Sequence, residues 1–114
     1  MEESILTSVK LYLGLTEDYT PFDQQIMMSI NTALNALTQL GIGPREGFTI
    51  HDATAVWSDW YGDDKRMEAA KLAVSIRVRL LFDPPASSTM EETLIAQKDE
   101  IEWRLLSTLN HPEV

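Results

Sequence analysis

The side chains best suited to catalysis in this 114-residue chain are its two histidines, His51 and His111. His51 is followed by Asp52, and a carboxylate beside an imidazole can orient that ring as a general base. The two histidines are far apart in sequence, and His111 lies in a C-terminal tail that we expect to be frayed. A surface loop without catalytic function is therefore the favoured interpretation of His51 and Asp52, and an enzyme is the weaker alternative.

Carboxylates that lie near one another raise the question of a metal site. Asp59, Asp63 and Asp64 surround one predicted turn. A calcium loop needs ligands at fixed alternating positions and a bidentate glutamate at its end, and this pattern is missing. The glutamates between residues 91 and 102 include no Glu-x-x-His pair, so a di-iron bundle has no support. We therefore expect no bound metal.

Two other kinds of reactive site are also missing from the sequence. Residues 41–44 (GIGP) lack the lysine and the following Ser or Thr of a phosphate-binding loop. The chain has no cysteine, which excludes disulfides, thiolate catalysis and cysteine–zinc sites. The sequence therefore predicts no cofactor and no enzymatic activity.

Trp57, Trp60 and Tyr61 form a dense aromatic cluster. On a short helix these three side chains share one face, because they stand at positions i, i+3 and i+4. Such a face can cover one end of a helical core. It can also bind a partner protein, because tryptophan and tyrosine are favoured in interface hot spots. The sequence does not separate these two interpretations, so the cluster is a candidate interface.

The charge of the chain is unevenly distributed. The net charge is −9, which repels nucleic-acid phosphates overall. One segment differs, because five bases and one acid lie between residues 65 and 82. At 100° per residue these bases spread around a helix, so stems that snorkel from a half-buried helix are the favoured interpretation. A basic surface that faces a partner, with Arg77 and Arg79 as candidate contacts, is the alternative.

The elements that must position these side chains can be placed from periodicity and punctuation. Apolar residues at helical spacing predict a helix over about 3–13, which Gly14 ends. A second helix is expected from Thr20, as N-cap, and Pro21, at the first helical position, up to residue 40. Residues 45–52 suggest a short extended piece, followed by a short helix that carries the two early tryptophans.

The segment 64–82 fits a helix, although residues 74–80 alternate apolar and polar like a strand. Its length decides for a helix, since strands of that length are rare, and its mostly apolar circumference predicts the central one. Paired prolines after Asp83 break the chain. A last helix starts at Ser88 or Thr89. Asp83 marks a candidate hinge or contact point, and a plain interhelical turn is the favoured interpretation.

These elements predict an all-α fold, a compact bundle of four to five helices with short Gly/Pro-marked loops. The length of the chain predicts a single domain over residues 1–114. The N-terminus shows no basic region before an apolar stretch, so we expect no secretory signal. The longest apolar runs are too short for a membrane helix, so we expect no membrane partner.

Several segments resemble the small head–tail connector (adaptor) proteins of tailed bacteriophages, also described as putative DNA-packaging proteins. The matching segments are 79–85 (RLLFDPP), 102–105 (EWRL), 9–15 (VKLYLGL), 23–26 (DQQI) and 40–42 (LGI). Their order and spacing carry the resemblance, which covers about three-quarters of the chain. Residues 43–62 lie outside it, so no role of Trp57 or Trp60 can be taken from the family.

The resemblance implies a structural phage or prophage protein that forms a homo-oligomeric ring beneath the portal protein. Such a ring joins the portal to a head-completion or tail protein, and DNA passes through its centre without sequence-specific binding. The resemblance thus implies a location at the head–tail junction of the virion, and in the bacterial host cytoplasm before assembly. No catalysis is implied.

A ring that repeats one contact needs two different complementary patches on each subunit. We expect Arg77 and Arg79 to contribute to the patch that meets a neighbour's acidic surface, and charge reversal at both positions to abolish rings. Two other classes stay open. A generic helical protein–protein interaction module without a virion role would form a stable dimer, and a DNA-binding module would show salt-dependent binding.

Overall fold

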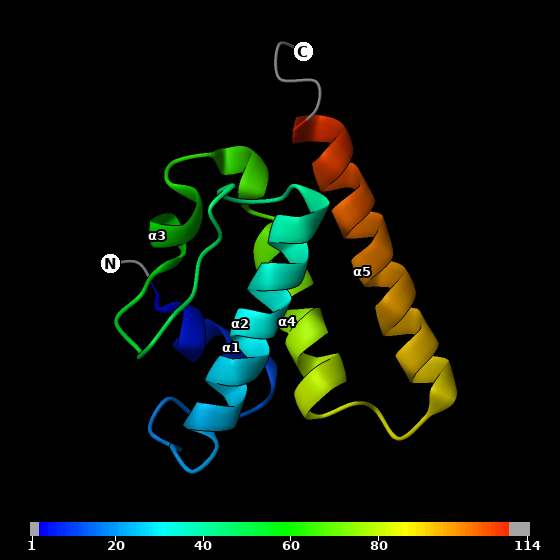
Figure 1. Cartoon of the computed structure of the whole chain (residues 1–114). Helices are drawn as coiled ribbons and strands as arrows, with labels where there is room; N and C mark the ends of the chain where they lie inside the picture. Colours follow the sequence, from blue (N-terminus) through cyan, green and yellow to red (C-terminus); the bar gives the residue numbers. More distant parts are fainter. Residues whose placement is uncertain (1–2, 110–114) are drawn as a thin grey trace.

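The computed structural model describes residues 3–109, which form helices joined by loops (Figure 1). Within this range the only strand-like pairing is one antiparallel bridge between Ser4 and Val56. The prediction of an all-α bundle is confirmed, and His111 lies outside the described residues. The elements are α1 (Ile5–Tyr12), α2 (Asp23–Leu40), α3 (Trp57–Tyr61), the 3-10 turn η1 (Lys65–Met67), α4 (Ala70–Phe82) and α5 (Ser88–Leu109).

Helix α4 is the centre of the bundle. It packs against α1, α2 and α5, and Figure 1 shows it between α2 and the long α5. Residues 74–80, whose alternation also suggested a strand, are helical throughout. Because α4 has neighbours on several sides, its buried residues surround most of the helix: Ala70, Ala73, Val74, Ser75, Ile76 and Val78.

The start of α2 differs from the sequence prediction. Thr20 does not cap the helix; its carbonyl accepts a turn hydrogen bond from the Asp23 N–H over 3.1 Å, and α2 begins at Asp23. The extra turn leaves Phe22 outside the helix, where its ring packs against that of Phe82 at a centroid distance of 5.7 Å. Tertiary packing of this ring therefore displaces a helix start that local sequence signals favour.

The ends of the other helices follow the expected chemistry. The Oγ of Ser4 accepts a hydrogen bond from the Thr7 N–H over 2.9 Å and so caps α1. Gly41 ends α2 with a φ of 97°, in the left-handed region that glycine tolerates. The break after Asp83 is confirmed, and Ser87, with its Oγ 3.3 Å from the Met90 N–H, caps α5.

The long segment between α2 and α3 is attached to the bundle through backbone groups. The side-chain amide of Asn31 donates to the Ile50 carbonyl over 3.0 Å, and its oxygen accepts from the Ile50 N–H over 2.8 Å. Ala55 accepts a hydrogen bond from the Ile5 N–H over 2.9 Å. Ile42 and Ile50 are buried in the core. These contacts position α3 over one end of the core.

Helix α5 is attached along one side only. Of its 22 residues, only Leu94, Glu102 and Leu105 are buried. The opposite face is therefore available to solvent or to another protein. A fully exposed long helix of mixed polarity gains its stability from that single packed side.

Candidate interaction surfaces

Trp57 and Trp60 lie in the core, with 1% and 2% of their surfaces exposed. The indole N–H of Trp57 donates to the Ser8 hydroxyl over 3.0 Å, and that hydroxyl donates to the Glu3 carboxylate over 2.7 Å. The two indole rings pack at a centroid distance of 6.1 Å. In this conformation the rings offer almost no surface, so their contact with a partner stays a prediction.

Tyr61 is the member of the aromatic cluster that reaches the surface. It is half-buried, and its hydroxyl donates to the Glu68 carboxylate over 3.1 Å. The Lys71 ammonium, followed by this hydroxyl, lowers the pKa of Glu68 below its ordinary value. Tyr61 and Glu68 help to line an open cavity of about 380 Å³ beside η1. A partner that uses this cluster would therefore meet Tyr61 first.

Arg77 is part of an internal ion-pair network between α4 and α5. Its guanidinium donates two hydrogen bonds to the Glu102 carboxylate, one of them over 2.9 Å. Lys98 lies 3.8 Å from the same carboxylate, at i and i+4 on α5. Glu102 is only 5% exposed. Such a two-pronged pair is strong when it is shielded from water, so Arg77 holds two helices together.

Arg79 lies on the other side of α4 from Arg77, because two residues along a helix rotate the side chain by about 200°. Arg79 is half-buried, and its Nε is buried without a hydrogen-bond partner among residues 3–109. The two arginines thus do not form one continuous patch. Arg79 has a charged head that its own subunit leaves unpaired, and its role in binding a neighbour remains a prediction.

Asp83 is exposed directly after α4, and its N–H donates to the Arg79 carbonyl over 2.8 Å. It lies at the edge of an open, mainly apolar cavity of about 410 Å³, whose other lining residues are Leu13, Leu15, Phe22 and Phe82. The structure therefore places this predicted contact point beside apolar surface. Its use as a hinge or contact stays a prediction.

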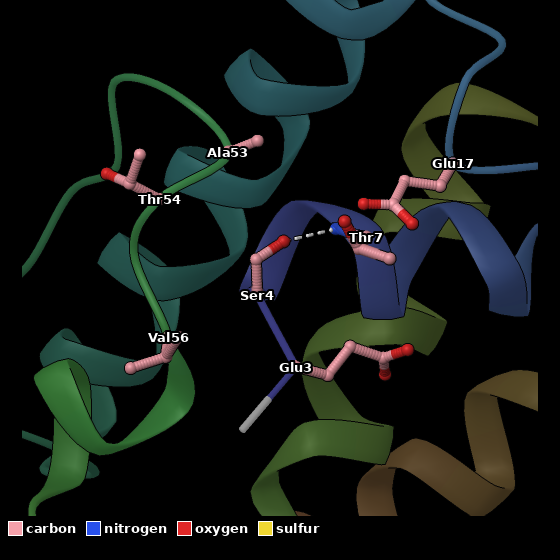
Figure 2. A pocket seen from close by; sticks show the side chains of 7 residues that line it. All are labelled: Glu3, Ser4, Thr7, Glu17, Ala53, Thr54 and Val56. Carbon is pink, nitrogen blue, oxygen red and sulfur yellow. Dashed lines mark hydrogen bonds between the residues drawn. The ribbon is translucent and has the colours of Figure 1, made fainter. Parts of the chain in front are cut away.

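The cavity of about 530 Å³ near the start of α1 contains no catalytic arrangement in the described chain. Figure 2 shows the side chains of Glu3, Ser4, Thr7 and Glu17 facing the loop of residues 53–56. His51 does not line it. Hydrogen bonds from the Thr54 hydroxyl and N–H, over 2.6 and 2.9 Å, lower the pKa of Asp52. Asp52 therefore stabilises its own loop.

A groove between α2, α4 and α5 was not apparent from the sequence. It has a volume of about 170 Å³ and is lined by Thr32, Ala33, Ala36, Arg77, Leu80, Leu81 and Lys98. The spacing of Lys98 and Glu102 gave a weak signal, since i, i+4 pairs share a helix face. We call this feature the α2/α4/α5 groove.

Residues 3–109 contain no group of three or more His, Cys, Asp or Glu side chains that could hold a metal ion. No helix in the same range has the length and apolar character needed to cross a membrane. The side chains described above serve packing, ion pairing and exposed surface. They define a small helical protein of the structural and interaction class.

A family model described as "Phage connector protein" matches residues 5–111. The chain therefore belongs to the phage connector protein family, and the resemblance seen in its sequence is confirmed. The match also includes residues 43–62, which that resemblance did not cover. No significant match is found among curated proteins or among solved structures. Family membership supports a structural role in a phage.

Proposed function

We propose that this protein is the subunit of a ring adaptor at the head–tail junction of a phage. In this role it binds the portal protein on one side and a head-completion or tail protein on the other, and DNA passes through the ring. The observation that carries the proposal is the family match over residues 5–111. The helical bundle, with its long helix attached on one side only, supports assembly through surfaces.

The charge of the chain supports passage of DNA without retention. A net charge of −9 disfavours contact with phosphates, and a channel that bound phosphates strongly would slow the movement of DNA. We therefore propose an acidic bore and no sequence-specific DNA binding. Before assembly the subunit would reside in the host cytoplasm, as a monomer or as a mixture of monomers and rings.

Electron microscopy of the purified chain, alone and mixed with the portal protein encoded beside it, tests this proposal. We expect ring-shaped particles that co-sediment with the portal. A stable dimer without affinity for the portal would instead support a generic interaction module. Salt-dependent binding to DNA, with a slope set by the number of phosphate contacts, would support a DNA-binding module. Either result would overturn the adaptor proposal.

A further inference from the structure

The most exposed aromatic side chain of the described residues stands on the free face of α5. Trp103 is 68% exposed, and its neighbours on that face are acidic or small. Asp99 and Glu100 lie one turn before it, and Ser107 lies one turn after it. A large apolar ring kept in water is an unusual feature that marks interaction surfaces. We call Trp103 with its acidic neighbours the α5 knob.

The α2/α4/α5 groove has complementary properties. Ala33 and Ala36 of α2, together with Leu80 and Leu81 of α4, give it apolar walls, and Leu81 is 55% exposed. The two ionisable side chains that line it, Arg77 and Lys98, are both basic. Buried Glu102 compensates one of these two charges. The groove is therefore apolar inside and basic at its edge.

The volume of the groove suits an aromatic ring. Its space of about 170 Å³ is slightly larger than the cavity of about 150 Å³ that binds benzene in an engineered protein. The six-membered ring of an indole therefore fits without a change of the walls. An apolar ring flanked by carboxylates also matches an apolar groove with a basic edge in charge.

The knob and the groove lie on different sides of the same helix. Lys98, which lines the groove, and Trp103 are five residues apart on α5, which corresponds to a rotation of about 140°. A single copy therefore cannot fill its own groove with its own Trp103. Two copies related by a two-fold axis would not need two such different surfaces. A contact between knob and groove is instead head-to-tail and can repeat.

We propose that Trp103 of one copy inserts into the α2/α4/α5 groove of the next copy, with Asp99 and Glu100 facing its Arg77 and Lys98. This inference rests on the proposed ring adaptor and names the contact between adjacent subunits. The occupant of the groove is thus a second copy of this chain. Repetition of the contact closes a ring if the rotation per subunit permits, and otherwise produces a filament.

Sedimentation velocity of the full chain over a concentration series measures the contact. We expect Trp103→Ala to weaken self-association by roughly 30-fold or more, as for a central tryptophan of an interface. Ala36→Phe, which fills the groove, should weaken it similarly. Leu11→Ala removes another large exposed apolar side chain, 53% exposed on α1, and should have no effect. Wild-type association of Trp103→Ala would overturn the inference.

A mixture of the Trp103→Ala and Ala36→Phe chains gives a sharper test. Each variant keeps one intact surface, so the two chains should form a heterodimer that cannot grow. Each variant alone should stay monomeric. A mixture that remains monomeric would contradict the head-to-tail contact.

Cross-linking keeps the inference testable if the groove variant does not fold. Because the chain has no cysteine, Thr32→Cys on one chain and Ser107→Cys on another provide the only two thiols for a short bis-maleimide. Both positions are exposed, and Trp103 is retained. We expect a dimeric product that disappears when Trp103→Ala is added to the Ser107→Cys chain. Thr49→Cys, an exposed loop position, replaces Thr32→Cys as the control.

These outcomes separate the contact from the proposed function. No cross-link, or a cross-link that persists without Trp103, would overturn the contact. Rings formed equally well by Trp103→Ala would reject the contact and leave the ring adaptor intact. A Trp103-dependent cross-link in a chain that does not bind the portal would retain the contact and reject the adaptor.

Discussion

Arg77 on α4 and Glu102 on α5 form a two-pronged ion pair, in which Nη2 donates to Oε1 over 2.9 Å and Nε donates to Oε2. The two residues are 25 positions apart in sequence. The pair connects the central helix to the helix that otherwise has few buried contacts. Arg77 therefore has a structural task as well as a place at the edge of the α2/α4/α5 groove.

Glu102→Ala should lower the free energy of unfolding by about 3 kcal/mol, because it leaves the charge of Arg77 partly buried without its partner. Urea denaturation followed by circular dichroism measures this change. The matched control is Glu100→Ala, which breaks the exposed pair with Arg104 on the same helix and should cost at most about 0.5 kcal/mol. Equal effects of the two variants would show that the Arg77–Glu102 pair contributes no more than a surface pair.

Arg79→Met should leave the free energy of unfolding unchanged or raise it by up to about 1 kcal/mol. The methionine keeps most of the apolar stem, and it removes an Nε that is buried without a partner in residues 3–109. Thermal and urea denaturation measure the effect. A loss of more than about 2 kcal/mol would mean that the guanidinium is satisfied within the subunit.

Arg79→Glu separates assembly from folding better than charge reversal at both arginines, because a glutamate at position 77 would face Glu102. We expect Arg79→Glu to keep its folded circular dichroism spectrum and to lose ring assembly. Lys65→Glu changes the same charge at an exposed position of η1 and serves as the control. Normal rings of Arg79→Glu in electron micrographs would contradict a role of Arg79 in the interface.

Gly43→Ala should destabilise the fold more than Gly47→Ala does. Both glycines have positive φ angles, of 95° and 86°, so each alanine should cost about 1–2 kcal/mol in backbone strain. A Cβ on Gly43 would also lie 2.6 Å from the Trp60 Nε1, whereas Gly47 has open space. We expect this overlap to add about 1–3 kcal/mol, measured by denaturation. Equal losses would show that Trp60 can move aside.

Asp64 gives a pH dependence with a defined sign. Its carboxylate accepts hydrogen bonds from the Arg66 side chain and N–H, which lower its pKa below the ordinary value of 3.8. A lowered folded-state pKa means that the stabilisation is present above pH 3.8 and disappears as the pH falls through the folded-state pKa.

The stability difference between the wild type and Asp64→Asn should therefore be constant near neutral pH and shrink in acid. Thermal denaturation at a series of pH values measures it. Asp63→Asn changes the same charge next to this contact and should show a smaller pH dependence. A difference that grows in acid would reverse the assignment.

Local sequence signals were sufficient for the helices and their breaks. Gly14, Gly41 and the prolines after Asp83 stop helices through steric effects that need no tertiary context. The segment 64–82 shows a limit of periodicity, because the alternation of residues 74–80 reflects burial on many sides and not a strand. Thr20 shows another limit, since the packing of Phe22 on Phe82 moves the helix start.

The surfaces could be predicted only in part. The basic character of α4 was visible, but the partner of Arg77 was not, because Glu102 is 25 residues away and many acids could have been chosen. Trp103 was visible within a helix pattern, and its exposure became clear only when one side of α5 was packed. The α2/α4/α5 groove arises from three separate helices, so no local pattern contains it.

The attachment of Trp57 to Ser8 and of Ala55 to Ile5 bears on how the chain is made. A ribosome releases α1 well before it has synthesised the residues that hold it. Until the middle of the chain emerges, this first helix lacks both its indole cover and its backbone tether. Prematurely terminated chains that stop before α3 should thus expose the apolar side of α1 and be preferred substrates for host proteases.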